Sequence, residues 1–220
     1  LAKSAQMSLD EYTQFVSSAC FLNQPNPITE WNALSRKQAQ LVSRLNKGSE
    51  IQFKSDNTDI SFRIQDRIWI NSDGQRTMPS GEIFTSPIED SGNGTIQFTY
   101  PSLLFGEVIE DLTLTIQDGV ITHWTSKNGS PLLDRLFQIS GANRVGEIAI
   151  GTNHAITKPT LNPLFDEKIA GTIHMAVGAS YPETGGQNES SIHHDFVTPF
   201  NNNSAIYLDN ILIYQNGSWR

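Results

Sequence analysis

The chain has 220 residues, of which 37% are hydrophobic and 17% are charged, a composition typical of a soluble globular domain with a buried core. The net charge of −8 argues against nucleic acid as a partner, because binding a polyanion needs a basic surface. Apolar runs such as 205–208 are too short to cross a bilayer, so no membrane partner is expected, and the single cysteine, Cys20, excludes an internal disulfide and favours a cytoplasmic location.

The first fifty residues predict two helices. Ser8 and Glu11 form the pattern of a capping box, which marks a helix start. A second helix follows the proline-rich segment 23–27, because apolar residues recur at near-helical spacing from 31 to 45. Gly48 ends this second helix.

From position 51 the apolar period changes to two, which indicates strands. Segments 51–54 and 59–64 predict a pair of strands, and 67–70 predicts a further one. Turn dipeptides flanked by alternating residues predict two hairpins, at 112–122 around Asp118-Gly119 and at 206–214 followed by Asn216-Gly217. A short helix is expected at 131–139. The predicted fold class is therefore α+β, with two N-terminal helices followed by a mostly antiparallel mixed sheet.

The sharpest chemical signal is Ser-Ile-His-His-Asp-Phe at 191–196. In an extended strand His193 and Asp195 point to one face and His194 to the other. An imidazole and a carboxylate two residues apart suit one divalent metal ion. The alternative is an ordinary polar surface loop.

Four more residues are candidates, each with an ordinary structural explanation. His174 lies in an apolar run and is either a ligand or a hydrogen-bonded core residue. Glu82 follows turn residues and is either a ligand or an exposed glutamate. Glu147 has apolar neighbours, so it is either buried with a partner or on the wet face of a strand. Tyr181 either packs or directs its phenol towards a site.

Five segments in order resemble the blocks of the aminopeptidase T family, the thermophilic-metalloprotease type of aminopeptidase. They are Met-Pro-Ser-Gly-Glu-Ile-Phe at 78–84, Gly-Glu-Ile-Ala at 146–149, the stretch 165–178 ending in Gly-Thr-Ile-His-Met-Ala-Val-Gly, Glu-Ser-Ser-Ile-His-His-Asp-Phe at 189–196, and Tyr-Gln-Asn-Gly-Ser-Trp at 214–219. Each block is short, but together the resemblance covers essentially the whole chain.

The resemblance implies an aminopeptidase that acts on peptides with a free N-terminus through two divalent ions (zinc, cobalt or manganese), and it suggests a homodimer. The implied metal ligands are Glu82, Glu147, His174, His193 and Asp195, with Tyr181 close to the metals. Glu82 or Glu147 would shuttle the proton, and Tyr181 would hydrogen-bond the oxyanion.

Two departures from the family pattern are Thr77, where asparagine is usual, and Lys168, where asparagine is frequent. Because neither is an implied ligand, we expect them to affect the substrate pocket rather than the metal site. The resemblance also implies a preceding domain, so residues 1–50 are expected to join to it and residues 51–220 to form the metal-binding catalytic domain.

Two other functions fit the same residues. Another dinuclear hydrolase, such as a phosphoesterase, would need cationic residues to hold phosphate, and only Arg144 and Lys168 lie near the motifs. The second alternative is a truncated domain that binds metal or a partner without catalysis.

Overall fold

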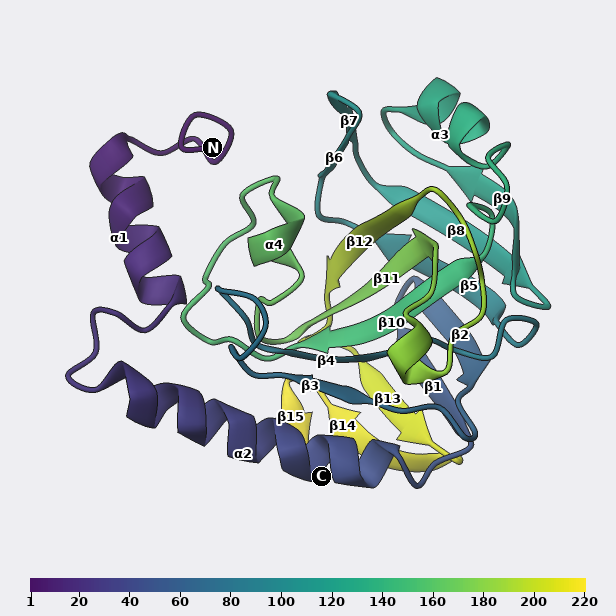
Figure 1. The fold of residues 1–220 in the computed structure, drawn as a ribbon. Coiled ribbons are helices and arrows are strands. Elements are labelled where there is room, and N and C mark those ends of the chain that lie inside the picture. Colours follow the sequence, from purple (N-terminus) through teal and green to yellow (C-terminus); the bar gives the residue numbers. More distant parts are fainter.

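The computed structural model describes residues 1–220 and has the α+β class expected from the sequence (Figure 1). The helices are α1 (Leu9–Ala19), α2 (Pro27–Leu45), α3 (Ser130–Leu136) and α4 (Pro163–Asp166), with a short 3-10 turn η1 (Pro182–Thr184). None of them is both long enough and apolar enough to serve as a membrane span.

Most strands belong to two antiparallel sheets. The larger sheet has eight strands, in the order β15 (Ser218–Trp219), β14 (Ile211–Gln215), β13 (Ala205–Leu208), β1 (Glu50–Ser55), β2 (Thr58–Arg63), β5 (Asn93–Phe98), β8 (Leu112–Gln117) and β9 (Val120–Thr125). The smaller sheet has five, in the order β12 (His193–Pro199), β11 (Thr172–Gly178), β10 (Val145–Gly151), β4 (Glu82–Thr85) and β3 (Ile70–Ser72). A separate hairpin joins β6 (Ser102–Leu104) to β7 (Glu107–Ile109).

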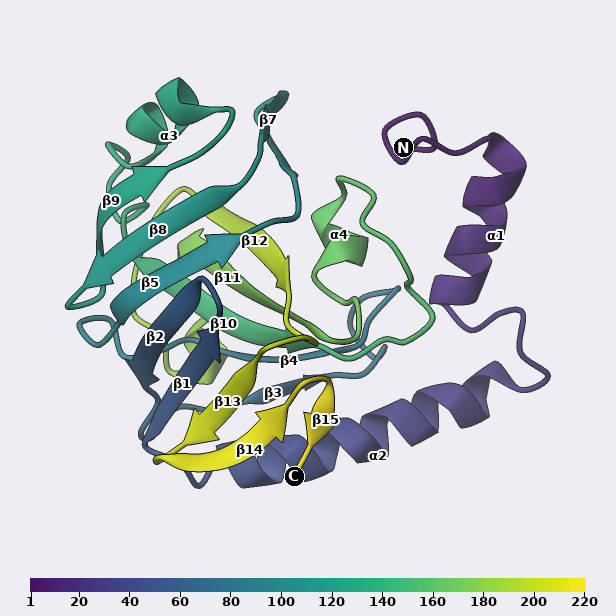
Figure 2. The same cartoon turned by 180° about the vertical axis from the view of Figure 1, so that it is seen from behind.

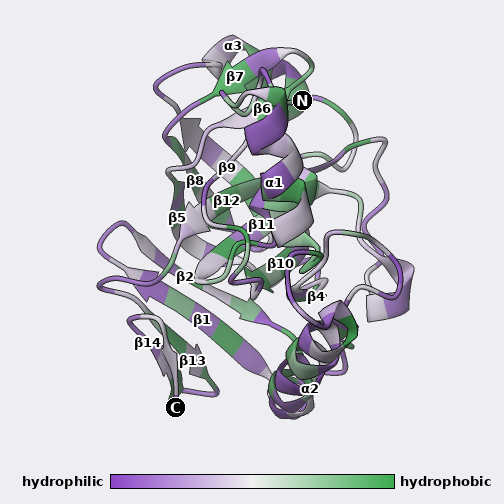
Figure 3. Cartoon of the chain, turned by 90° about the vertical axis from the view of Figure 1, so that its left-hand side faces the viewer, coloured by the Kyte–Doolittle hydropathy of each residue, from purple (hydrophilic) through white to green (hydrophobic).

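The strands of the larger sheet lie side by side at the back of the molecule (Figure 2). Apolar and polar residues alternate along β1, as the green and purple bands of Figure 3 show, and only the alternate apolar residues are buried. Both sheets contribute side chains to one apolar core of 33 buried residues, with Phe53, Phe62 and Phe98 from the larger sheet and Ile148, Met175 and Phe196 from the smaller. The core therefore lies between the two sheets and leaves the other face of the smaller sheet for polar residues.

Turn chemistry sets the hairpins where the sequence predicted them. Asp118 and Gly119 both have positive φ (49° and 73°) between β8 and β9, as a type I′ turn requires. Asp209 and Asn210 make the same kind of turn between β13 and β14, and Asn216-Gly217 leads into β15. The only parallel pairing is an isolated bridge between Asn153 and Ile169, so the named sheets are antiparallel throughout.

The strand predicted at 67–70 was placed wrongly. A turn at residues 65–66, where Asp66 has φ of 61° and Arg67 N–H donates to the Ile64 carbonyl, precedes this stretch, and residues 67–69 belong to no strand. Strand β3 begins only at Ile70.

The two N-terminal helices pack on the rest of the chain. The predicted capping box is present, since Ser8 accepts from the Glu11 amide and Glu11 from the Ser8 amide. Helix α2 lies along β3 and β4, and buried Gln38 on this helix donates to the Glu82 carbonyl at 2.7 Å. Phe15 of α1 packs against Phe165 of α4, with ring centroids 5.2 Å apart. The helices therefore support the edge of the smaller sheet and the loop beside it.

Candidate metal centre

The five implied ligands come from four neighbouring strands of the smaller sheet. Glu82 begins β4, Glu147 lies on β10, His174 on β11, and His193 and Asp195 on β12. In the cross-strand register, Ala176 lies between Glu147 and Asp195, and Gly178 lies opposite His193. Because directly paired residues share a face, the small residues of β11 bring the polar side chains of its neighbours over one surface.

Glu147 reaches that surface because β10 carries a bulge. Val145 pairs with Val177 and belongs to the core between the sheets. In a regular strand Glu147, two residues later, would point into the same core. The bulge between Val145 and Glu147 instead places the glutamate opposite Ala176 on the polar face.

The carboxylates and imidazoles face one another at short range. His174 Nε2 lies 3.1 Å from Glu82 Oε2 and 3.6 Å from Glu147 Oε1. The other oxygen of Glu147, Oε2, lies 3.2 Å from His193 Nε2, which is in turn 3.7 Å from Asp195 Oδ2. The Glu147 carboxylate therefore lies between the two histidines and connects two groups of ligand atoms.

Several of these atoms are buried and have no hydrogen-bond partner. They are Glu82 Oε2, both ring nitrogens of His174, His193 Nε2 and Asp195 Oδ1. Buried polar atoms are almost always paired, and leaving one unpaired costs about 1–3 kcal/mol. Histidine nitrogens and carboxylate oxygens that converge on a shared space are the donor set that zinc and related divalent ions use, so the residues present fit such ions.

A backbone contact orients His193. Its Nδ1 lies 2.8 Å from the Ala179 carbonyl oxygen, so Nδ1–H donates there and Nε2 faces Glu147 and Asp195. This arrangement, with one ring nitrogen held by a carbonyl, is the usual support of a metal-binding histidine.

The charges of the site shift its pKa values. Burial favours neutral Glu147, but its contacts with His174 and His193 outweigh burial and lower the pKa to about 2. Burial likewise opposes the charge on His174, but the contacts with Glu147 and Glu82 raise its pKa well above the ordinary value. Burial and the neighbouring charge of Glu147 raise the pKa of Asp195. The pKa of each group therefore depends on the charge of its neighbours, as is expected where several carboxylates share a small buried volume.

Tyr181 lies beside the site, as the family resemblance implied. Its ring meets the His193 ring edge-on, with centroids 4.8 Å apart, and packs against the Phe84 ring, with centroids 5.2 Å apart. Burial, together with the charges of Glu147 and Asp195, raises the pKa of the phenol, which therefore stays protonated and able to donate.

His194 points away from the site, as strand alternation predicted. Its Nε2 lies 2.7 Å from Ser102 Oγ on β6. Burial and the charge of His193 lower its pKa to about 4, so this histidine is a neutral, satisfied core residue.

The structure adds two residues that the sequence analysis missed as part of the site. Glu167 and Lys168 follow α4, and Glu167 forms a possible ligand group with Glu82 and His174, with ligand atoms within 4.8 Å of one another. Lys168 Nζ lies 3.0 Å from Glu82 Oε1 and also donates to Glu167. Lys168, which we expected to affect only the substrate pocket, is therefore in direct contact with an implied ligand. The positions of Glu167 and Lys168 depend on how the α4 loop packs, and no sequence pattern around these two residues indicates that packing.

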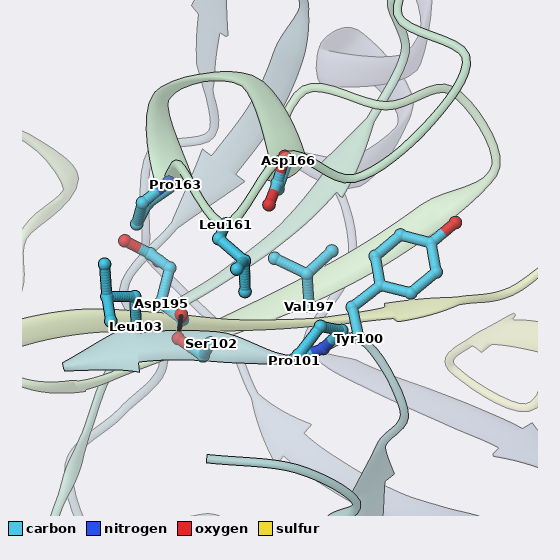
Figure 4. Close-up of a pocket in the computed structure, with 9 residues that line it drawn as sticks. All are labelled: Tyr100, Pro101, Ser102, Leu103, Leu161, Pro163, Asp166, Asp195 and Val197. Atoms are coloured by element: carbon cyan, nitrogen blue, oxygen red, sulfur yellow. Dashed lines mark hydrogen bonds between the residues drawn. The ribbon is translucent and has the colours of Figure 1, made fainter. Parts of the chain in front are cut away.

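A pocket opens beside the site, lined mainly by the loop before β6 and the α4 loop (Figure 4). Its lining residues are Tyr100, Pro101, Ser102, Leu103, Leu161, Pro163, Asp166, Asp195 and Val197. Asp195 is shared between this pocket and the ligand groups, and Asp166 lies near Tyr100. Burial raises the pKa of Asp166 to about 6, although Thr160 donates to it twice. Apolar and polar side chains therefore line the pocket together, and two of the lining residues, Asp166 and Asp195, carry carboxyl groups.

The remaining histidines and the cysteine lie outside the site. His123 and His154 are exposed. Cys20 is buried at the end of α1, as expected, and burial raises the pKa of its thiol.

Residues 1–219 match the sequence profile of a family described as thermophilic metalloprotease M29. Aminopeptidase 2 of Geobacillus stearothermophilus is 26% identical over 96% of this chain and 59% of its own length. Aminopeptidase T of Thermus thermophilus is 28% identical over 80% of this chain and 49% of its own length. The chain thus spans only about half to three-fifths of the length of these curated relatives.

Two solved structures share the fold. Wild-type AmpT from Thermus thermophilus has a TM-score of 0.76 at 24% identity, covering 89% of this chain and 56% of that chain. The 2,5-dihydroxypyridine dioxygenase from Pseudomonas putida KT2440 has a TM-score of 0.68 at 20% identity, covering 82% of this chain and 57% of that chain. Both structures are less than 25% identical to this chain, so the likeness shows the fold and does not by itself decide what the chain does.

Proposed function

The chain belongs to the thermophilic metalloprotease family M29, and on that premise we propose that it forms the metal-binding part of an aminopeptidase that releases N-terminal residues from peptides. The observation that carries the proposal is the convergence of unpartnered, buried donor atoms from four adjacent strands. Leaving buried donor atoms without partners is costly, and a bound cation would satisfy them.

We propose Glu82, Glu147, His174, His193 and Asp195 as the ligands of two divalent ions. His174 and Glu82 would hold one ion, and His193 and Asp195 the other. Glu147 directs one oxygen towards each histidine, which supports it as the ligand that both ions share. Ions held there would supply Lewis acidity and activate water near neutral pH.

The other residues position the substrate and the protons. The protonated phenol of Tyr181 would donate a hydrogen bond to the oxygen of the carbonyl under attack, where negative charge develops. A site carboxylate, Glu82 or Glu147, would carry the proton to the leaving amine.

Some parts of the proposal rest on the resemblance rather than on contacts. They are the choice of zinc, cobalt or manganese and the homodimer, whereas the proposed cytoplasmic location rests on the single cysteine. The division of the chain at residue 50 is also a proposal, although α1 and α2 both pack against the part that follows.

An activity assay on metal-stripped and reloaded protein tests the function. The chain is treated with a chelator, reloaded with Zn²⁺, Co²⁺ or Mn²⁺, and offered a leucyl amide and its N-acetylated form. The proposal predicts release of leucine from the free amine only, and only after reloading. His193→Ala should lose activity by about a thousandfold or more, since a ligand of the reaction centre is removed.

The matched control is His123→Ala, which removes an exposed histidine far from the ligand groups and should keep full activity. Because the chain spans about three-fifths or less of the length of its relatives, the same assay is run on a version extended to their length. Hydrolysis of the N-acetylated substrate at an equal rate would contradict an aminopeptidase. Metal binding without hydrolysis in both versions would favour the non-catalytic alternative.

A further inference from the structure

The two groups of ligand atoms differ in their charged neighbours. One group consists of Glu82, Glu167 and His174, and the other of Glu147, His193 and Asp195. Lys168 contacts only the first group, through ion pairs with both of its carboxylates. No lysine or arginine pairs with Glu147 or Asp195, whose charged contacts are the two histidines.

Lys168 is a fixed part of the first group. Its side chain is only 4% exposed, and its backbone carbonyl accepts from the Asn153 amide. It engages Oε1 of Glu82, whereas Oε2 of the same carboxylate faces His174 without a hydrogen-bond partner. The ammonium and an incoming ion would therefore share one carboxylate.

Sharing a carboxylate weakens it as a metal ligand in two ways. The ammonium withdraws electron density from the carboxylate that must bind the ion, and it places a positive charge within a few ångströms of a second positive charge. Repulsion at that range inside a protein is large compared with thermal energy. The second group carries no such penalty.

From this asymmetry we propose that Lys168 makes the two metal positions unequal. This inference rests on the proposed function and adds to it an order of binding. The first divalent ion binds tightly at Glu147, His193 and Asp195. The second binds about tenfold or more weakly at Glu82 and His174, with Glu147 shared and with Glu167 and the lysine beside it. The chain therefore holds one ion where metal is scarce and two where it is abundant.

Stepwise Zn²⁺ binding to the chelator-treated chain tests this by calorimetry, with the bound zinc counted by mass spectrometry after equilibrium dialysis. The expected result is two steps whose dissociation constants differ by about tenfold or more. His174→Ala should keep the tight step and His193→Ala should lose it. Two equal steps, or the reverse assignment, would overturn the proposal.

Substituting the lysine tests the cause. Lys168→Met removes the charge and keeps most of the side-chain length, so the weak step should tighten about tenfold while the tight step changes less than about twofold. Lys168→Arg keeps the charge and should keep the difference. Lys127→Met, which removes a surface lysine paired with Glu110, is the matched control and should bind as the unaltered chain does.

Lys168→Met leaves two buried carboxylates without their lysine partner, so a second variant covers a failure to fold. Glu167→Gln removes one carboxylate of the weak position, and should weaken only that step. An equal effect on both steps, or on neither, would overturn the assignment. A chain that binds no zinc at all would instead contradict the proposed function, and so the two failures are distinguishable.

Discussion

At the scale of single residues, the strand pattern predicted the faces of His193, His194 and Asp195 but not their partners. Alternation correctly separated His193 and Asp195 from His194, because strand geometry is local. The carbonyl of Ala179, which orients His193, lies directly after the end of the neighbouring strand β11. The sequence alone did not indicate this contact. Lys168 was assigned to the wrong place for the same reason: its contact with Glu82 joins segments far apart in the chain.

The titration of His193 gives a pH dependence. Burial lowers its pKa, but contact with Glu147 and the charge of Asp195 outweigh burial and raise it from 6.5 to about 9. A raised pKa means that the folded chain holds this proton more tightly than the unfolded chain. The resulting stabilisation is complete below pH 6.5 and is lost as the pH rises through about 9.

We therefore expect the melting temperature of the metal-free chain to fall between pH 6.5 and pH 9. Thermal unfolding followed by circular dichroism in a chelating buffer measures this. In His193→Gln, which cannot take up the proton, the decline should be shallower. An identical decline in the variant would show that another group is responsible.

At the scale of elements, the bulge in β10 is what brings Glu147 to the site. Sequence alternation alone leaves the glutamate on the side of Val145, which is a core position. Gly146 makes the bulge possible, because a Cβ atom there would lie 2.2 Å from the Ala179 carbonyl oxygen. The fold class and the hairpins were predictable from period and turn residues, whereas this irregularity was not.

Gly146→Ala should therefore damage both stability and metal binding. We expect a loss of about 2 kcal/mol or more in the free energy of unfolding, since backbone must move to admit the methyl group. Zinc affinity should fall with it, because the displaced strand carries Glu147. Chemical denaturation and zinc calorimetry measure the two effects.

Gly106→Ala is the comparison, since Gly106, unlike Gly146, has positive φ (84°) and has no atom within 4 Å of the added carbon. It should cost only the conformational strain of about 1 kcal/mol and leave zinc affinity unchanged. Unaltered zinc affinity in Gly146→Ala would show that the bulge does not position the ligand.

At the scale of the whole molecule, one face of the smaller sheet builds the core and the other carries the chemistry. The N-terminal helices complete this arrangement, because α1 packs against the α4 loop that leads to Glu167 and Lys168. The sequence predicted both helices from caps and spacing. It did not indicate the split into two sheets, or that α1 supports the site, since both depend on pairings between distant segments.

Phe15→Ala tests that support. The Phe15 side chain is buried against Phe165, Ala19 and Ile169, so its removal should cost about 3 kcal/mol of unfolding free energy. Loosening of the α4 loop should also lower zinc affinity at the position that contains Glu167. Leu9→Ala on the same helix removes a side chain that is 74% exposed and should change neither. Equal effects of the two substitutions would contradict the role of α1.

The most direct test of the account is to locate the ions by crystallography. Crystals of the chain grown with excess Zn²⁺ would be measured on both sides of the zinc absorption edge. The account predicts two anomalous peaks within bonding distance of Glu82, Glu147, His174, His193 and Asp195, with Glu147 bonded to both. Peaks elsewhere, or none at these residues in a zinc-saturated crystal, would contradict it.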